Sequence, residues 1–322
     1  MPDHPPYSTP KTVVFVLVGV LLYWALALAS ESLLMRNGAM NPVYKIEMTP
    51  PGNLDLVVLG ASHAMPLDLG GMEGWMEADS GSRILNLAGP GTGPLYNRFL
   101  LQHLLARNGA RKILYVADSF AFLSPLWNED RFTDPKLLAH TPFVPRLARI
   151  LAAYVLKAGV DPRALLDYLT SFSKINDRDR FVRNVWEGEA TFDRSFPVST
   201  SAIESRIAYL YPEGGDRNGL PHYLAVLHSI ISIARDHGAS ITIAMPPLPA
   251  AFRDRLPDEA LYEAKIRETA EAAGASFVDW SRLIDGQDFY ADTDHLNRKG
   301  VGLLYREALR PLISDSRPAA HR

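Results

Sequence analysis

Two short groups of polar residues have the types and spacing of a nucleophile and its proton acceptor. Ser62 follows an apolar run and the small residues Gly60 and Ala61, so we expect its hydroxyl on a tight turn beside free backbone N–H groups. Near the other end of the chain, Asp292 stands three residues before His295. A carboxylate at this spacing can orient the imidazole and leave its second nitrogen to accept a proton from a serine. The chemistry indicated is nucleophilic attack on an acyl group.

Both groups also have simpler structural explanations. Ser62 suits the cap of a helix, and Asp292 with His295 fits a helix cap beside a surface histidine. Asp294 is a second candidate for the orienting carboxylate, although adjacent side chains usually point apart. A metal site made of His63, Asp292 and His295 is a further alternative. The serine interpretation explains more of the flanking sequence, so we expect no metal.

The composition of the chain excludes several kinds of nucleophile and partner. The chain has 322 residues and no cysteine, which excludes disulfides, a thiolate nucleophile and cysteine-ligated zinc. Its 33 Lys and Arg residues against 36 Asp and Glu residues give a formal charge of -3, without a long basic run. We therefore expect no nucleic-acid partner and no cofactor, and a nucleophile that is an oxygen or a nitrogen.

Apolar runs of strand length alternate with helical stretches, which predicts an open, mostly parallel α/β sheet. Strands buried on both faces give such nearly continuous apolar runs, and ligands bind beyond their carboxyl ends. The expected strands are Leu54 to Leu59, Arg83 to Leu87, Lys112 to Ala117, Ser240 to Ala244 and Ser276 to Val278, and the helices between the last three are Pro221 to Asp236 and Glu259 to Ala273.

About a hundred residues, 120–219, separate the third expected strand from the fourth, and we interpret them as a helical insertion or lid over the strand ends. Within them, Val144 to Lys157 predicts a helix with basic residues near one face. It fits a membrane-surface or partner-binding helix, but a core-packed helix is the simpler interpretation. Lys174 to Arg194 mixes charges of both signs and is typical of a solvated surface.

Nineteen uncharged residues, Thr12 to Ser30, predict a membrane-spanning helix that residues up to 35 can extend. Ala27-Leu28-Ala29 also fits cleavage of a signal peptide after Ala29, but the apolar run is longer than a signal sequence needs. We expect a single-pass anchor in the cytoplasmic membrane with the following domain on its outer side. The expected organisation is a tail (1–11), an anchor (12–35), a linker (36–53), an α/β domain containing the insertion (54–315) and a second tail (316–322).

Three blocks, in this order, resemble the SGNH or GDSL-like hydrolase superfamily: Gly60-Ala61-Ser62-His63, Asn86-Leu87-Ala88-Gly89-Pro90-Gly91 and Asp292-x-x-His295. The resemblance covers Leu54 to about Leu312 without the insertion and implies a flavodoxin-like three-layer sandwich. It implies Ser62 as nucleophile, His295 as general base and Asp292 as its orienting carboxylate. It also implies an oxyanion hole built from the N–H groups of Ser62 and Gly91, in a cleft lined by His63 and Asn86.

The sequence departs from that family after the third expected strand, where a Gly-x-Asn-Asp block belongs. The chain instead has Ala117-Asp118-Ser119. Asp118 can donate a hydrogen bond only if protonated, and we expect it to line the cleft, while the Ser119 hydroxyl is the candidate replacement for the missing amide. Losing one oxyanion donor can cost about 2.7 to 4 kcal/mol of transition-state stabilisation, which disfavours fast, broad esterase activity.

In this departure and in its predicted anchor, the chain is similar to a membrane-bound subgroup of the superfamily. This subgroup includes the D-alanyl transfer protein DltD and periplasmic proteins that work beside membrane-bound O-acyltransferases. The resemblance implies O-acyl transfer to, or removal from, a cell-surface glycan, with acetyl as the best candidate and an acyl donor and glycan acceptor as partners. Two alternatives stay open. One is a non-catalytic partner of an acyltransferase or glycan synthase, and the other is a secreted esterase or lipase released by cleavage after Ala29.

Overall fold

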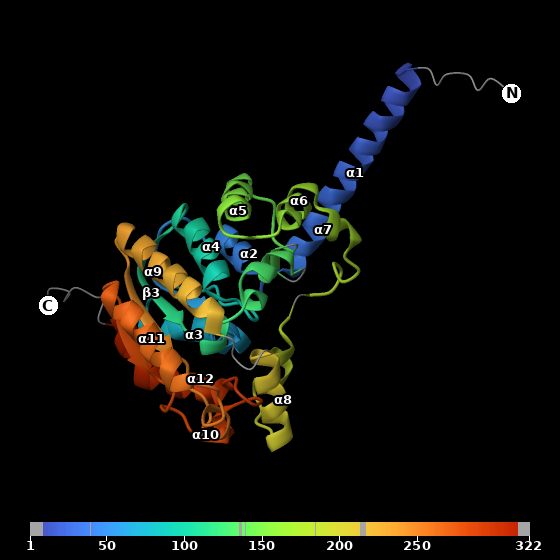
Figure 1. The fold of residues 1–322 in the computed structure, drawn as a ribbon. Helices are drawn as coiled ribbons and strands as arrows, with labels where there is room; N and C mark the ends of the chain where they lie inside the picture. Colours follow the sequence, from blue (N-terminus) through green and yellow to red (C-terminus); the bar gives the residue numbers. More distant parts are fainter. Residues whose placement is uncertain are drawn as a thin grey trace.

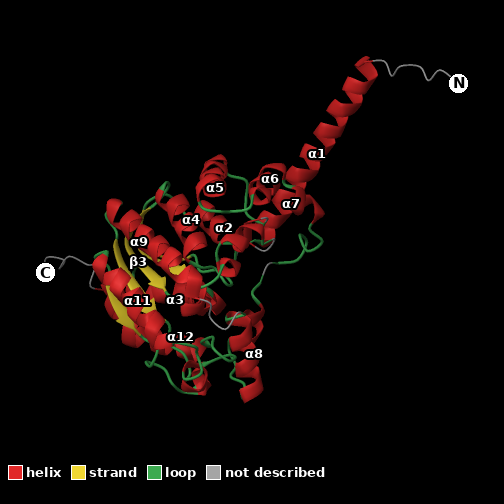
Figure 2. Ribbon diagram, in the orientation of Figure 1, coloured by secondary structure: helices red, strands yellow, loops and turns green. Residues whose placement is uncertain are grey.

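A five-stranded parallel sheet forms the centre of the molecule, with strand order β2-β1-β3-β4-β5 (Figure 2). The computed structural model describes residues 9–38, 40–134, 137–138, 140–183, 185–212 and 217–314. This is the doubly wound, flavodoxin-like order, in which the connections reverse between β1 and β3 and open a crevice there. The strands are β1 (Asn53–Gly60), β2 (Ile84–Asn86), β3 (Gly109–Val116), β4 (Ser240–Met245) and β5 (Ser276–Asp279), which confirms the predicted α/β sheet.

Helices cover both faces of the sheet. In β1, Val57 and Leu59 pack into the layer containing α4 and α9, whereas Leu56 and Val58 pack into the layer containing η1 and α3. Burial on both faces explains why the strands read as continuous apolar runs. The first layer consists of α4 (Pro94–Leu105), α9 (Leu220–Asp236) and α11 (Glu259–Ala272). The second layer consists of η1 (Ser62–Gly71), α3 (Met72–Ser80), α12 (Arg298–Leu304), the π-helical turn η9 (Tyr305–Leu309) and α13 (Arg310–Ser314). The short helices α10 (Ala250–Arg253) and η8 (Gln287–Phe289) follow β4 and β5, respectively.

The segment expected as a linker contains a helix that belongs to the domain. Asn41 caps α2 (Pro42–Met48) by accepting hydrogen bonds from the N–H groups of its first turn. Val43 and Ile46 are fully buried in the core, and Lys45 forms an ion pair with Asp68 of η1. The chain therefore passes from the N-terminal helix into the domain through a docked helix.

The described residues of the insertion form short helices joined by loops, and they contain no strand. Leu147, Leu151 and Tyr154 of α5 are buried, so this helix packs into the core, and the membrane-surface alternative is wrong for it. The elements are η2 (Ser119–Phe122), η3 (Pro125–Trp127), η4 (Glu129–Thr133), α5 (Pro145–Lys157), α6 (Pro162–Thr170), α7 (Phe172–Asn176), η6 (Glu187–Thr191), α8 (Thr200–Leu210) and η7 (Arg217–Gly219). Figure 1 shows α8 apart from α5, α6 and α7, at the opposite end of the insertion.

A long helix, α1 (Thr9–Asn37), projects away from the domain (Figure 1). Within its span Pro10–Asn37, the most apolar 18 residues have a mean hydropathy of 2.5, and only 6% of them are buried. The helix is long and apolar enough to cross a membrane, although a signal sequence has the same properties. It ends two residues beyond the predicted anchor.

Candidate functional site

Ser62 lies just beyond the carboxyl end of β1, at the reversal point of the sheet. Gly60 has a φ of 148°, and a Cβ on it would lie 2.8 Å from the carbonyl oxygen of Val116 in β3, so the chain can turn here only through glycine. Ser62 then opens η1, where the first N–H groups have no partner within the helix. Ser62 is 7% exposed, and its hydroxyl has no hydrogen-bond partner among the described residues.

The loop that carries Gly91 is fastened to the same turn. The Asn97 side chain accepts a hydrogen bond from the N–H of Gly60 at 3.0 Å, and the Thr92 hydroxyl donates to the carbonyl of Gly60 at 2.8 Å. Gly91 has a φ of 62°, and a Cβ on it would lie 2.7 Å from the ring of Trp127. Within the described part of the chain no acceptor takes its N–H, so Ser62 and Gly91 both retain a donor for an oxyanion.

His295 and Asp292 are joined as their spacing predicts. Nδ1 of His295 donates to the Asp292 carboxylate, with distances of 2.8 and 3.0 Å to its two oxygens. Asp292 also accepts the N–H of His295 at 2.8 Å, which closes the turn between them. Burial raises the pKa of Asp292, but the hydrogen bond from His295 outweighs it and lowers that pKa. The cap of α12 is Asn297, and His295 is 5% exposed, so a helix cap beside a surface histidine does not describe this pair.

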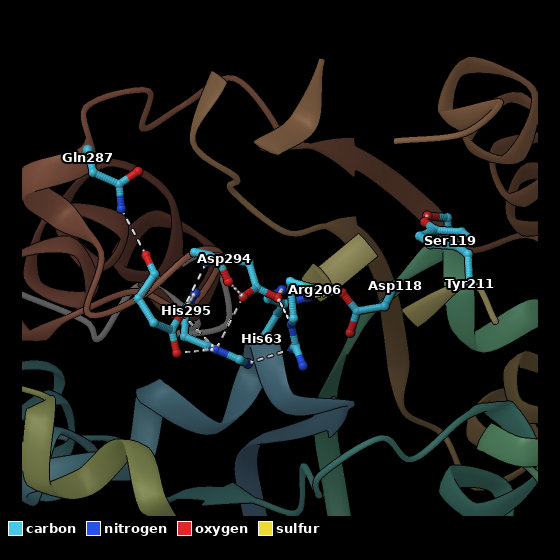
Figure 3. Close-up of polar contacts among 10 residues, drawn as sticks. His63, Asp118, Ser119, Arg206, Tyr211, Gln287, Asp294 and His295 are labelled. Atoms are coloured by element: carbon cyan, nitrogen blue, oxygen red, sulfur yellow. Dashed lines mark hydrogen bonds and ion pairs between the residues drawn. The ribbon is translucent and has the colours of Figure 1, made fainter. Parts of the chain in front are cut away.

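His63 lies between two carboxylates instead of simply lining the cleft (Figure 3). Its Nδ1 pairs with Asp118, which follows β3, and its Nε2 lies 3.0 Å from Asp294. Arg206 of α8 reaches the same oxygen of Asp294 at 2.8 Å. Two basic and two acidic side chains thus form one network, which we call the His63 network.

The His63 network makes His63 a cation. Burial alone would lower the pKa of the imidazole, but Asp118 and then Asp294 outweigh it and raise the pKa to about 10. Burial also raises the pKa of Asp294, yet His295, His63 and Arg206 hold it well below its usual range. Asp118 therefore accepts a hydrogen bond from an imidazolium and is no oxyanion donor. The His63 ring also packs on His295, with 5.1 Å between ring centroids.

The guanidinium of Arg206 lies against Nε2 of His295, the nitrogen that would accept the proton of a serine. Nδ1 of His295 is paired with Asp292, which leaves Nε2 for a serine, and Nη2 of Arg206 lies 3.4 Å from Nε2. The bond between nucleophile and base that a serine triad requires is not formed among the described residues. Trp186, also from the insertion, packs edge-on against the imidazole of His295 at 4.9 Å between centroids. The insertion therefore closes over the predicted base.

Two of the residues predicted from the sequence point elsewhere. The Ser119 hydroxyl donates to Glu259 and lies 2.7 Å from the hydroxyl of Tyr211, on the side of Asp118 away from His295 in Figure 3. Ser119 is therefore no replacement for the missing oxyanion amide in this arrangement. The Asn86 side chain donates to the carbonyl of Ala64 in η1 at 2.8 Å and accepts the N–H of Ala88 at 2.9 Å, so it ties the loop after β2 to η1.

A small pocket lies beside the His63 network. His63 and Asp118 line one side of it, and Ser119 and Glu259 provide further polar groups. Burial, with a smaller contribution from Asp118, raises the pKa of Glu259 to about 7. The remaining lining is chiefly apolar, from residues Phe120, Leu210, Tyr211, Pro246, Leu248, Phe252 and Leu256. The pocket suits a small group with an apolar end.

Three side chains around the His63 network also have the spacing of a cation site. Potential ligand atoms of His63, Asp294 and His295 lie within 4.8 Å of one another. Both nitrogens of His63 are already paired with carboxylates, and Arg206 lies on the Asp294 oxygen that would bind an ion. Asp292, expected in the alternative metal site, is bonded to Nδ1 of His295. These contacts favour an ion-pair network.

Several site residues were missed by the sequence analysis. Arg206, Trp186 and Glu259 approach the site from elements that no motif marks, and Arg206 lies 88 positions before Asp294. For Arg206 and Trp186, the only indication in the sequence was the interpretation of residues 120–219 as a lid over the strand ends. Asn97 could have been noticed as an amide directly beside the apolar residues Leu95 and Tyr96 of α4, because a polar group that is buried needs partners.

The comparisons with known proteins find distant similarity only. No protein-family model matches this sequence, and no curated protein matches it. A candidate acylhydrolase from Bacteroides fragilis NCTC 9343 aligns with a TM-score of 0.44 at 8% identity, over 84% of this chain and 93% of its own. A protein described as a candidate platelet activating factor from Streptococcus pneumonia aligns at 0.41 and 14% identity, over 94% and 99%. A candidate SGNH hydrolase from Slackia heliotrinireducens aligns at 0.40 and 12% identity, over 82% and 97%.

Replacing His63 by glutamine should destabilise the fold in a pH-dependent way. The pKa of His63 is raised from 6.5 to about 10, so its stabilisation is complete below pH 6.5 and is lost as the pH rises to 10. We expect His63→Gln to lower the free energy of unfolding by about 3–5 kcal/mol at pH 6, because it leaves the buried carboxylate of Asp118 without its cationic partner. The difference from wild type should shrink towards pH 10.

Chemical unfolding of the detergent-solubilised chain between pH 6 and 10 measures this difference. His228→Gln is the matched control, because His228 is exposed on α9. A destabilisation by His63→Gln that stays constant over this pH range would show that His63 is neutral.

Proposed function

We propose that this chain is a membrane-anchored, serine-dependent acyl-ester enzyme of the SGNH type. The observation that carries the proposal is the bond of 2.8 Å between Nδ1 of His295 and Asp292. The pair follows the last strand of a sheet whose first strand leads into Ser62. The motif order along the chain and the flavodoxin-like strand order support the same class.

The chemistry follows from the groups already described. The Ser62 hydroxyl attacks the acyl carbonyl while Nε2 of His295 takes its proton, and Asp292 stabilises the imidazolium that forms. The N–H groups of Ser62 and Gly91 bind the oxyanion. His295 then returns the proton to the leaving group, and water or a sugar hydroxyl resolves the acyl-enzyme. Arg206 has to leave Nε2 of His295 before the first proton transfer.

The substrate that fits best is a short acyl ester on a glycan. The pocket beside His63 is small, and its lining is chiefly apolar. Its small volume favours acetyl over a long acyl chain. We further propose that α1 anchors the domain on the outer face of the cytoplasmic membrane, where an acyl donor, a glycan acceptor and a membrane-bound O-acyltransferase are the partners.

A non-catalytic assembly partner is the second candidate. It is favoured by the guanidinium of Arg206 at the base, and by the Ser119 hydroxyl, which is bonded to Glu259 instead of replacing the missing oxyanion donor. In that case the site would serve to hold the insertion on the domain. The two candidates differ in whether Ser62 is reactive.

A fluorophosphonate should modify the wild-type chain at Ser62 and should leave Ser62→Ala unmodified. A serine with a general base becomes nucleophilic enough to be phosphonylated, and an unactivated serine does not. Intact mass and peptide mapping measure the adduct. Ser240→Ala is the control, because Ser240 is exposed at the start of β4, and it should be labelled like wild type. No adduct on wild-type Ser62 would contradict the enzyme and favour the assembly partner.

Replacing Arg206 by glutamine should speed this labelling. The substitution removes a donor from Nε2 of His295 and frees the lone pair for the serine proton. We expect a rate increase of about tenfold, which corresponds to one hydrogen bond of ~1.4 kcal/mol. Arg183→Gln, an exposed arginine of the same insertion, should label at the wild-type rate. Slower labelling of Arg206→Gln would instead show that Arg206 supports the reactive arrangement.

A further inference from the structure

The N-terminal helix is longer than a bilayer requires, and its second half packs on the insertion. The 29 residues of α1 extend about 43 Å at 1.5 Å per residue, against a hydrocarbon layer of ~30 Å. Ala27, Ser30 and Leu34 share one side of the helix and are buried, with α7 packed against it. Figure 1 shows α6 and α7 beside this half of α1 and nothing beside the other half. The insertion therefore packs along the second half of α1 only.

Two polar contacts show how far along α1 the insertion reaches. Glu31 of α1 forms an ion pair of 2.7 Å with Lys174 of α7, whose side chain is only 2% exposed. Eight residues nearer the N-terminus, about 12 Å along the helix, the Tyr23 hydroxyl donates to the carbonyl of Thr170 at 2.8 Å. The end of α6 thus lies beside the uncharged stretch of α1 and not below it.

Large apolar side chains surround that contact and face outward. Leu166 and Leu169 of α6 and Phe172 of α7 are 63, 48 and 61% exposed, and we call these three residues the apolar collar. They lie within one helical turn of Thr170 in the sequence. Trp24, next to Tyr23, is 57% exposed. Exposed tryptophan and tyrosine collect at the boundary between membrane and water.

The end of α6 also has the hydrogen bonding that a lipid environment demands. Its last carbonyl groups have no partner within the helix and must be satisfied without water in a membrane. The carbonyl of Thr170 accepts from Tyr23, and the Thr170 hydroxyl donates to the carbonyl of Leu166 at 2.8 Å. The carbonyl and hydroxyl of Thr170 are thus paired, while the apolar side chains at this end of α6 are exposed.

We infer that the apolar collar inserts into the lipid leaflet next to the domain. If the uncharged stretch fills the hydrocarbon layer, Tyr23 and the collar lie inside that layer; if Tyr23 and Trp24 mark its boundary, the collar lies at the boundary. Both placements bring the collar into contact with lipid. The inference rests on the membrane anchor of the proposed function, but it is independent of the catalytic assignment.

Insertion of the collar would hold the domain at a fixed height and orientation. The cap of α2, Asn41, comes four residues after the end of α1, and α2 is docked in the core. With α1 and the apolar collar both on the membrane, and with α2 docked in the core, the domain has little freedom to move as it would on a flexible tether. A site held in this way acts on groups presented at the membrane surface.

Spin labels on the full-length chain in phosphatidylethanolamine and phosphatidylglycerol nanodiscs test this contact. The chain has no cysteine, so Leu169→Cys and Phe172→Cys each provide a single labelling site. Both labels should be relaxed by oxygen, which partitions into lipid, and should be shielded severalfold from a water-soluble nickel chelate. The matched control is Leu261→Cys, because Leu261 is an exposed leucine (37%) on α11, which lies far from α1 in Figure 1.

A label on Phe15→Cys, in the exposed half of α1, separates failure of the collar from failure of the anchor. If this label is in lipid while the collar labels meet the chelate as freely as the one at position 261, the inference is wrong and the anchor stands. If the label at position 15 is also in water, the membrane anchor itself is wrong. Collar labels shielded from both oxygen and chelate would contradict lipid contact and indicate a covering protein surface.

Discussion

The imidazolium of His63 lies between Asp118 and Asp294, and the rest of the site depends on this arrangement. The three residues come from the turn after β1, the end of β3 and the loop before α12. Their charges hold together segments that are up to 231 positions apart in sequence. An unpaired buried charge is costly, so each partner keeps the others in position. The turn with Ser62 and the loop with His295 are consequently held side by side.

The same network connects the insertion to the chemistry. Arg206 completes the charge balance at Asp294 and at the same time lies on the base nitrogen of His295. A displacement of α8 would therefore change both the network and access to His295. At its other end the insertion is bonded to α1 through Lys174 and Glu31. One polypeptide segment thus contacts both the candidate site and α1.

The sequence was sufficient for the sheet and for local pairs of residues, but not for contacts across the insertion. The strand after Asn53 and its turn at Gly60 could be predicted because burial on two faces and a glycine turn leave a local signature. The contact of Asp292 with His295 follows from a spacing of three. The position of Arg206 depends on how the insertion folds back, and spacing carries no information about that.

The corrections have the same physical origin. Asp118 and Ser119 are neighbours in sequence, but their side chains pair in different directions, with His63 and with Glu259. Sequence reasoning placed both in the cleft because it could not supply these buried partners. The expected linker was also incomplete, because the burial of Val43 and Ile46 depends on core surface formed much later in the chain. Long-range partners decide the role of each of these residues.

Nitrogen NMR of the chain labelled with ¹⁵N-histidine tests the central claim most directly. The signals of His63 are assigned by their loss in His63→Gln. With a pKa of about 10, His63 should show two protonated ring nitrogens at pH 8 and should titrate near pH 10. A neutral imidazole at pH 8, with one nitrogen unprotonated, would contradict the His63 network as the interaction that organises the site.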